Sequence, residues 1–518
     1  MARSTRVAAR DWFSEMRRLF ESAYYVSASN LYDQVTEEGE SPSNDAILLR
    51  ARLFLKTDSK RIVPFLLRQD LRKPTQEQTA RREMYLGTGY SRLGDFGEAD
   101  KHFAKAKEVF RDGSALGELA AHLTRHYLSQ RNLEAAEKWQ KESLADRSLR
   151  GKIRSEHLAS YLMARHERYV DQVNCVLRVL DLIGKERDEF VEDWYVAVYT
   201  LAVLAREIPH PQAAKRAKAE VDLDFDWPAD FAVRRFQAIK AVAWCQALAG
   251  DELSCFRYLR MAEHVEVAPV WRAILHLDRS FFAAIVGERR WAANEFSMAE
   301  DLAERIAWDE TSGEERVALL LLAELATAHA PKKAPFYIAR FNDLGKLRSN
   351  LQHFAFDGRL QAMQDYAAGL VSISADDKPA AAEHLRKAWR TFDAIGYDVR
   401  AASAALALHV ATGKPRWAHL AEEKLERYPK SWLARNLSAI PREPETPALS
   451  PMQAAVTGLL CEGLSTDEVA RKLKLSRNTV LNHLKVVYRK LGVTSRGALV
   501  VAAMRRNIVA PEATSRTQ

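Results

Sequence analysis

Apolar residues along this chain recur at the spacing of an α-helix rather than in the alternation typical of a β-strand. Near the C-terminus, for example, Val480, Leu484, Val487 and Leu491 share one helical face. Glycine and proline are sparse, with 21 and 17 in 518 residues, so few positions interrupt such helices. The pattern predicts an all-α fold. The length predicts about two to four domains, or one helical-repeat array with an added module.

The clearest repeated unit runs from Tyr85 to Phe110. Its small residues allow two helices to approach closely, and its large residues fill the space between successive units. The pattern comprises Leu86, Gly87 and Tyr90 in a first helix, Gly94 and Phe96 at a turn, and Ala99, Phe103 and Ala106 in a second helix. At these positions the unit resembles a tetratricopeptide repeat, and the resemblance implies two paired helices.

The unit recurs along the chain, with fewer of its signature residues in the later copies. Tyr127, Leu133 and Ala136 stand 37 positions after Tyr90, Phe96 and Ala99. Further units are expected at residues 243–262, 281–302, 365–389 and 404–425, and the pattern leaves their boundaries and their total number open. We therefore predict a tetratricopeptide-like helical solenoid over residues 10–437.

A solenoid presents a concave face, and such faces usually bind peptides, proteins or small effectors. We expect an unknown small molecule or protein as the partner of this solenoid, because nothing in the sequence names the ligand. The alternative is that the solenoid only holds protomers together.

A change of composition marks the end of the predicted solenoid. Residues 438–448 contain Pro441, Pro444 and Pro447, which favour a stiff, extended linker that cannot continue a helix. Residues 449–518 contain 11 Lys and Arg against 4 Asp and Glu, and so carry +7 of the net charge of +8. A near-neutral body with a basic C-terminal module suggests that only the module meets a polyanion, although a solvated basic helix face would show the same charge.

Signals for helix ends follow the linker at short intervals over residues 449–508. Ser450 with Gln453, and Ser465 with Glu468, show the spacing of a capping box. The four expected helices begin after Ser450, Ser465, Ser476 and Ser495, and the first and third end at Gly463 and Gly492. Only three residues separate the second helix from the third. A short helix, a tight turn and a longer helix are typical of a helix-turn-helix motif.

The two helices of this motif have buried and outward positions. Their expected core comprises Val469, Ala470, Leu473, Leu475, Val480, Leu484, Val487 and Leu491. The major groove of DNA admits one α-helix, and the third helix offers it a polar face. We expect Leu481 to contact a thymine methyl, Asn482 to pair with adenine and Lys485 to donate to guanine. Residues suited to phosphates or positioning are Arg471, Lys472, Arg477, Asn478, Thr479, Arg489 and Lys490.

Family-specific positions recur through this segment. They are Glu462-Gly463-Leu464-Ser465, Glu468-Val469-Ala470, Leu473, Leu475-Ser476, Thr479-Val480, His483 and Lys490-Leu491-Gly492-Val493. On these residues the segment resembles the DNA-binding domain of LuxR-type, or GerE-like, regulators. The resemblance implies a four-helix domain that dimerises partly through its last helix, here residues 495–506, on two-fold symmetric DNA sites.

The segment departs from the family pattern in two places. Met452 and Gln453 stand where the family usually has Arg and Glu, and Leu481 stands where it usually has a basic residue. The second departure shifts the expected base contacts toward Asn482 and Lys485. The whole chain resembles large LuxR-type regulators with a helical-repeat sensor domain, without the nucleotide-binding domain that many of them carry.

Other candidate chemistry is weak. Thr412-Gly413-Lys414 lacks the upstream glycine of a phosphate-binding loop, and Pro415 follows it, so a turn between helices is expected. His122 and His126 lie one helical turn apart without an evident third metal ligand, and a structural pair is expected. The four cysteines form no C-x-x-C pair. We predict no enzymatic activity, no cofactor and no metal site.

The functional prediction follows from the C-terminal module. Neither a secretory signal nor an apolar run long enough to span a membrane is evident, which favours a cytoplasmic protein without a membrane partner. We predict a sequence-specific transcription regulator that binds double-stranded DNA as a homodimer, with RNA polymerase as a further candidate partner. The main alternative is a helical-repeat adaptor or scaffold whose C-terminal module docks on protein. A sigma-like factor is a third reading, disfavoured because no polymerase-binding core region is evident.

Overall fold

The fold was analysed in a computed structural model of the chain. It describes residues 11–210, 212–223, 227–346, 357–439, 449–491, 493 and 495–505. Over these residues the secondary structure is helical, with no strand, as the sequence predicts. The chain divides into two units, Met1–Leu437 and Ser438–Gln518, called here the repeat domain and the C-terminal unit.

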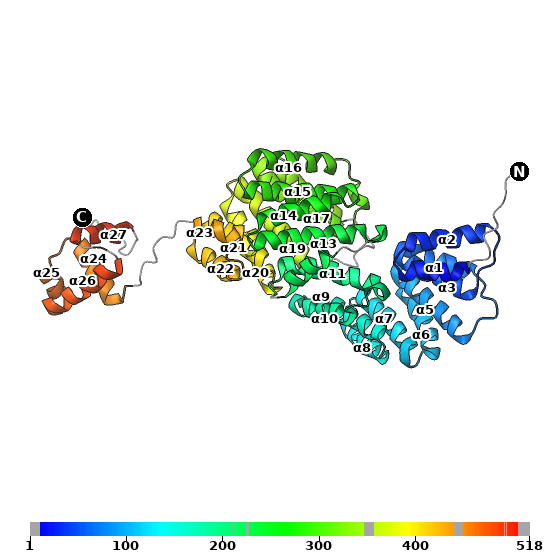
Figure 1. Cartoon of the computed structure of the whole chain (residues 1–518). Coiled ribbons are helices and arrows are strands. Elements are labelled where there is room, and N and C mark those ends of the chain that lie inside the picture. Colours follow the sequence, from blue (N-terminus) through cyan, green and yellow to red (C-terminus); the bar gives the residue numbers. More distant parts are fainter. Residues whose placement is uncertain are drawn as a thin grey trace. The chain divides into compact units, whose positions relative to one another are not determined.

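The first half of the repeat domain consists of paired helices (Figure 1). Within each pair the second helix packs on the first, and the next pair packs on one or both of them. The helices are α1 (Trp12–Glu21), α2 (Tyr25–Glu37), α3 (Asn44–Thr57), α4 (Ile62–Arg68), α5 (Gln76–Leu93), α6 (Phe96–Val109), α7 (Gly113–Ser129), α8 (Leu133–Glu142), α9 (Leu149–Arg165) and α10 (Tyr169–Ile183).

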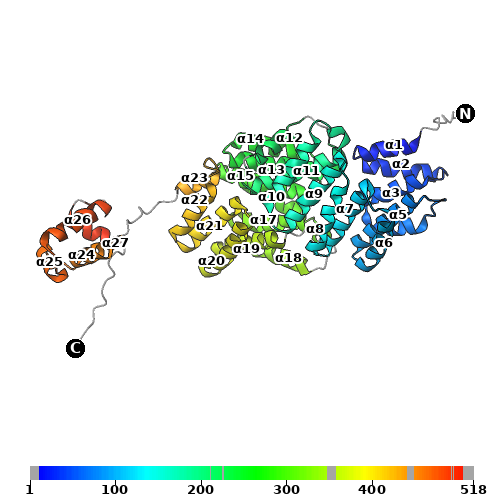
Figure 2. The same cartoon turned by 90° about the horizontal axis from the view of Figure 1, so that it is seen from below.

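The second half continues the same arrangement, and Figures 1 and 2 show the pairs stacked along the domain. The helices are α11 (Val191–Glu207), α12 (Ala213–Val221), α13 (Ala232–Leu248), α14 (Glu252–Glu263), α15 (Pro269–Ile285), α16 (Arg289–Ala303), α17 (Gly313–His329), α18 (Ala334–Lys346), α19 (Asp357–Ser374), α20 (Lys378–Ala394), α21 (Asp398–Thr412), α22 (Pro415–Leu425) and α23 (Trp432–Ala439). The predicted tetratricopeptide-like solenoid is therefore confirmed as a fold.

The signature unit explains why the pairs pack so closely. Helix α5 starts in a capping box between Thr75 and Gln78 and ends at Gly94, whose φ of 83° suits glycine. A Cβ added at Gly87 would lie 3.0 Å from the ring of Phe103 on α6. The small residue therefore lets the two helices approach, as the pattern predicts. The weaker units expected from the sequence coincide with the pairs α13–α14, α15–α16, α19–α20 and α21–α22.

The repeat domain curls so that α11 meets both earlier and later repeats. Lys56 of α3 forms an ion pair with Glu192 at the start of α11. At the other end of α11, the Glu207 carboxylate lies 3.9 Å from the guanidinium of Arg400 on α21. Residues about 190 positions apart along the chain therefore lie together on the inner side of the solenoid.

The C-terminal unit has four described helices, α24 (Pro451–Cys461), α25 (Thr466–Leu473), α26 (Arg477–Leu491) and α27 (Arg496–Arg505). The capping boxes expected at Ser450–Gln453 and Ser465–Glu468 are both formed. Apolar residues from all four helices make one core, including Val456, Val469 and Leu499. The prolines of the expected linker, together with Gly492 and Arg506, lie outside the described residues.

No described helix is long and apolar enough to cross a membrane. The four cysteines carry free thiols, of which Cys175, Cys245 and Cys255 are buried.

Candidate nucleic-acid interface

A tight turn joins α25 to α26. Lys474 ends α25 in the left-handed conformation, with φ of 53°, and the amide of Leu475 donates to the carbonyl of Ala470 at 2.9 Å. Ser476 then caps α26, because its hydroxyl accepts from the amide of Thr479 at 3.1 Å. The chain thus leaves α25 and starts the longer helix α26 within three residues.

The inner faces of α25 and α26 pack against each other and against α24. The residues predicted as the helix-turn-helix core are buried at Val469, Ala470, Val480, Leu484, Val487 and Leu491, and half-buried at Leu473 and Leu475, which pack against the same cluster. Burying one face of α26 directs its other face outward, so the core determines which residues a partner can meet.

The three predicted base-reading residues lie on that outward face. Leu481 keeps 44% of its surface exposed although it is a large apolar residue. Asn482 and Lys485 are exposed as well, and the three positions span one turn of α26. An apolar contact, an amide and an ammonium group therefore lie close together on a single helix surface.

The predicted phosphate-contacting and positioning residues fall into two groups. Arg471, Lys472, Arg477, Asn478 and Arg489 are exposed. Two of these cations have a carboxylate within the unit: Lys472 lies 3.3 Å from Glu462, and Arg477 lies 3.3 Å from Asp467. Such exposed pairs are weak, so the cations can turn to another anion at little cost.

Thr479 and Lys490 are placed differently. The Thr479 hydroxyl lies 2.8 Å from the hydroxyl of Ser476, so this half-buried side chain belongs to the helix cap. The Lys490 ammonium donates to the Gln453 side-chain carbonyl at 3.0 Å, which ties the end of α26 to the start of α24. Gln453 is one of the positions at which the sequence departs from the family pattern, and it serves both this contact and its own capping box.

Sequence reasoning assigned no role to Arg496, which anchors the last helix. Its guanidinium donates to the carbonyl of Leu464 at 2.7 Å and to that of Leu460 at 3.4 Å. These carbonyls belong to the end of α24 and the loop after it, so Arg496 holds the start of α27 against the turn before α25. The sequence offered one signal for this role, which is an arginine directly after Ser495 at the start of a predicted helix.

The helix-turn-helix geometry agrees with the protein family that this segment matches. Residues 447–503 match the family model described as "Bacterial regulatory proteins, luxR family". The C-terminal unit contains a LuxR-family domain. Over 59 residues the chain is 46% identical to proteins named HTH-type transcriptional regulator from Mycobacterium bovis and Mycobacterium tuberculosis. The alignment covers 11% of this chain and 7% of each relative, so the likeness concerns the LuxR-family domain alone.

Two solved structures align over most of this chain, but their similarity to it is low. The Cut9–Hcn1 hetero-tetramer of the APC/C has a TM-score of 0.37 and 13% identity, covering 95% of this chain and 90% of that one. Naa15/Naa10 bound to HypK-THB has a TM-score of 0.23 and 13% identity, covering 97% of each chain. The repeat fold rests on the helix pairs described above.

The histidine pair and the Thr412-Gly413-Lys414 segment, for which the sequence predicts structural roles, make structural contacts. The His126 imidazole is buried between the Ser91 hydroxyl at 2.9 Å and the Asp100 carboxylate at 3.0 Å, and burial lowers its pKa. His122 lies 2.9 Å from the Thr88 hydroxyl. Gly413 ends α21 with φ of 65°, directly before the α22 helix that starts at Pro415, so this segment is the expected turn.

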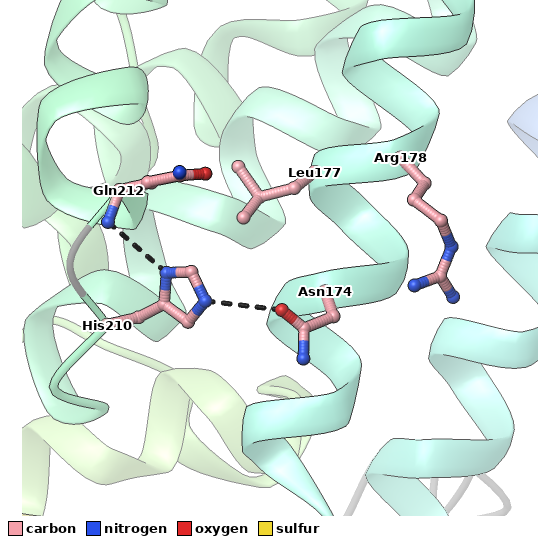
Figure 3. Close-up of a pocket in the computed structure, with 5 residues that line it drawn as sticks. All are labelled: Asn174, Leu177, Arg178, His210 and Gln212. Atoms are coloured by element: carbon pink, nitrogen blue, oxygen red, sulfur yellow. Dashed lines mark hydrogen bonds between the residues drawn. The ribbon is translucent and has the colours of Figure 1, made fainter.

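A polar hollow of about 500 Å³ lies beside α10 (Figure 3). It is lined by Asn174, Leu177, Arg178, His210 and Gln212. The backbone N–H of Gln212 donates to His210 Nδ1 at 3.3 Å, and His210 Nε2 lies 3.2 Å from the side-chain oxygen of Asn174. Arg178 points away and pairs with Glu156 at 2.9 Å. Since His210 and Arg178 are engaged with protein partners, we assign this hollow no ligand.

Proposed function

We propose that this chain is a sequence-specific DNA-binding transcription regulator in which α26 enters the major groove. The observation that carries the proposal is the division of α26 into a buried apolar face and an outward face bearing Leu481, Asn482 and Lys485. The LuxR-family match supports it. Asn482 would pair with adenine, Lys485 would donate to guanine, and Leu481 would touch a thymine methyl.

Exposed cations around α26 supply the sequence-independent part of binding. Arg471, Lys472, Arg477 and Arg489, together with the amide of Asn478, would contact phosphates on either side of the groove. Thr479 and Lys490 would hold α26 in place and would not contact DNA directly. Thr479 belongs to the cap of α26, and Lys490 ties α26 to α24.

The proposal extends to the oligomeric state, the location and the partners of the protein. The regulator would act in the cytoplasm as a homodimer on two-fold symmetric sites, with α27 contributing to the dimer contact. The repeat domain would sense an effector or partner, or hold the protomers together. RNA polymerase is a candidate partner of the DNA-bound form.

The test starts from the full-length chain and a pool of random DNA, from which bound sequences are selected. The selected site is then titrated in gel-shift assays at several salt concentrations. Asn482→Ala and Lys485→Ala should each lower the preference for the selected site by about tenfold to a hundredfold, and leave non-specific binding unchanged. Arg471→Ala should weaken all DNA about equally and reduce the salt slope by about 1.

Arg390→Ala, which removes an exposed cation of the repeat domain, is the matched control and should leave both quantities unchanged. Failure of the full-length chain to retard any DNA at low salt, with the C-terminal unit folded, would contradict the proposal. That result would favour an adaptor whose C-terminal module docks on protein.

A further inference from the structure

The inner side of the repeat domain encloses a second cavity, in a region that the proposed function leaves without a defined ligand. Its lining comes only from odd-numbered helices, α11, α13, α15, α17, α19, α21 and α23. The curl that brings α21 against α11 closes it, since Arg400 and Glu207 stand on those two helices. Side chains from seven helices therefore converge on one small space.

Two groups in this cavity have hydrogen-bonding capacity that the protein leaves unused. Glu324 of α17 keeps only 14% of its side chain exposed, and its Oε1 is buried without a hydrogen-bond partner. Trp244 of α13 likewise has a buried Nε1–H without an acceptor. One is an acceptor and the other a donor, and buried polar groups are nearly always satisfied. The pair calls for a ligand that offers both an N–H donor and an oxygen acceptor.

The charges in the cavity are incompletely paired. Arg206 forms a close ion pair with Glu207, at 2.7 Å. Arg400 is less well placed, because its nearest carboxylate atoms are 3.6 Å away at Glu324 and 3.9 Å away at Glu207. These distances exceed those of a good charge-assisted hydrogen bond. Burial raises the pKa of the Glu324 carboxyl despite Arg400, which is consistent with a carboxylate short of positive partners.

The remaining wall is aromatic and the space is small. Trp244 stacks on Phe281, with ring centroids 5.1 Å apart, and Trp432 meets both rings edge-on. The cavity has a volume of about 70 Å³. This is several times the roughly 10–15 Å³ that one water molecule needs, and well below the roughly 300–1,000 Å³ of sites for drug-sized ligands.

We propose that this cavity binds a free α-amino acid with a small side chain, of about the size of alanine, because larger side chains exceed the volume of the cavity. The ammonium group would donate to Glu324, the carboxylate would accept from Arg400 and the Trp244 indole, and the side chain would lie against the aromatic wall. The zwitterion of an α-amino acid carries the donor and the acceptor group on one carbon atom, and it matches a cavity that holds both signs of charge. This inference rests on the proposed sensing role of the repeat domain and identifies its ligand class.

The test is calorimetric titration of the full-length chain with glycine, alanine, serine, threonine and valine at up to millimolar concentration. At least one of them should bind and raise the Tm of the protein. The amide of that amino acid, which lacks the carboxylate, and its N-acetyl derivative, which lacks the ammonium, should each bind at least about tenfold more weakly.

Two substitutions locate the binding in this cavity. Glu324→Gln should weaken it by about tenfold or more, because the amide keeps the shape but loses the charge. Trp244→Phe should weaken it by about fivefold, because the ring remains and the donor is lost. The matched controls are Glu383→Gln, an exposed carboxylate of α20, and Trp389→Phe, which removes another buried unpartnered indole N–H outside the cavity. Neither should change the affinity.

Flat titrations with all five amino acids overturn the inference, as does binding that Glu324→Gln and Trp244→Phe both leave unchanged. Trp244→Phe decides the matter if Glu324→Gln fails to fold. DNA retardation is measured on the same preparation. Flat titrations with intact DNA binding overturn this inference alone, whereas loss of DNA binding by the unaltered chain overturns the proposed function.

Discussion

The two units of this protein differ in whether they bury charged side chains. In the repeat domain the Lys240–Asp278 ion pair is buried, and Glu207 is buried beside Arg206 and Arg400. In the C-terminal unit the described buried side chains are apolar apart from Thr457, and cations such as Lys485 lie on the surface. The described elements of both units are helices, so the difference does not come from secondary structure.

This contrast indicates where each unit meets a ligand. A small domain with an apolar core has its polar side chains outside, where they can bind a large polyanion such as DNA. A solenoid that curls on itself has an inner side as well as an outer one, and polar groups on that inner side are available to a ligand small enough to enter. The proposals for α26 and for the inner cavity follow from the same physical distinction.

The largest expected effect comes from breaking a buried charge pair of the repeat domain. Lys240 and Asp278 keep 8% and 4% of their side chains exposed and lie 2.8 Å apart. Lys240→Met leaves the carboxylate buried and unpaired, which should cost about 3–5 kcal/mol of folding free energy. Calorimetry of the full-length chain should show a lower Tm for the repeat domain. The double variant Lys240→Met/Asp278→Leu should recover most of the loss, and no recovery would show that the pair does more than balance charge.

The apolar core of the C-terminal unit should be nearly as sensitive. Leu484→Ala removes a buried side chain and should cost about 2–5 kcal/mol, a large part of the stability of a domain this small. All DNA binding should fall, specific and non-specific together. Leu481→Ala, one turn away on the exposed face, should change the stability by less than about 0.5 kcal/mol. Equal destabilisation by the two would contradict the assignment of faces on α26.

A smaller effect should appear as a pH dependence of the repeat domain. Burial lowers the pKa of His122 to about 3, against the opposing effect of Glu118. The folded state therefore binds this proton less readily than the unfolded state, whose histidine has a pKa of about 6.5. The stabilisation is present above pH 6.5 and is lost as the pH falls toward 3, by up to about 1 kcal/mol near pH 5.5.

Melting curves of the full-length chain between pH 7 and 5 would measure this loss. His122→Gln should reduce the pH dependence by the part that His122 contributes, whereas His419→Gln, at a side chain 78% exposed, should leave it unchanged. An unchanged slope in His122→Gln would show that other buried groups cause the acid sensitivity.

The smallest effect is expected at a surface pair of the C-terminal unit. Arg477 and Asp467 are 67% and 65% exposed, and their atoms lie 3.3 Å apart. Asp467→Asn should leave the Tm unchanged and should strengthen DNA binding by about twofold at most, since it frees one cation for a phosphate. A large loss of stability would show that the pair is structural.

Local features of the C-terminal unit could be predicted closely. Ser450, Ser465 and Ser476 cap their helices as the sequence indicates, because a cap depends on hydrogen bonds between residues three positions apart. The buried stripe of α26 follows from the helical period in the same way. The contact between Lys490 and Gln453 was missed, because it joins residues 37 positions apart on helices whose packing angle the pattern does not contain.

The inner cavity could not be predicted from the sequence, although a signal was present. Glu324 interrupts the otherwise apolar residues 317–326 of its helix, and an isolated charge in such a stretch indicates an unusual environment. Nothing in the sequence indicates that the helices lining the cavity converge, since Glu207 and Arg400 meet although more than a third of the chain separates them. Convergence depends on the rotation between successive helix pairs, accumulated over many repeats.

The sequence by itself determined the helical class, the tetratricopeptide-like pairing, the basic C-terminal unit and its helix-turn-helix. Each of these depends on spacings of a few residues, where backbone hydrogen bonding and side-chain periodicity act directly. The tertiary structure alone decided which helices form the inner side of the repeat domain, and that Trp244, Glu324 and Arg400 share a cavity there. The physical reason is that small packing angles between neighbouring repeats add up over the solenoid, and only their sum brings distant side chains together.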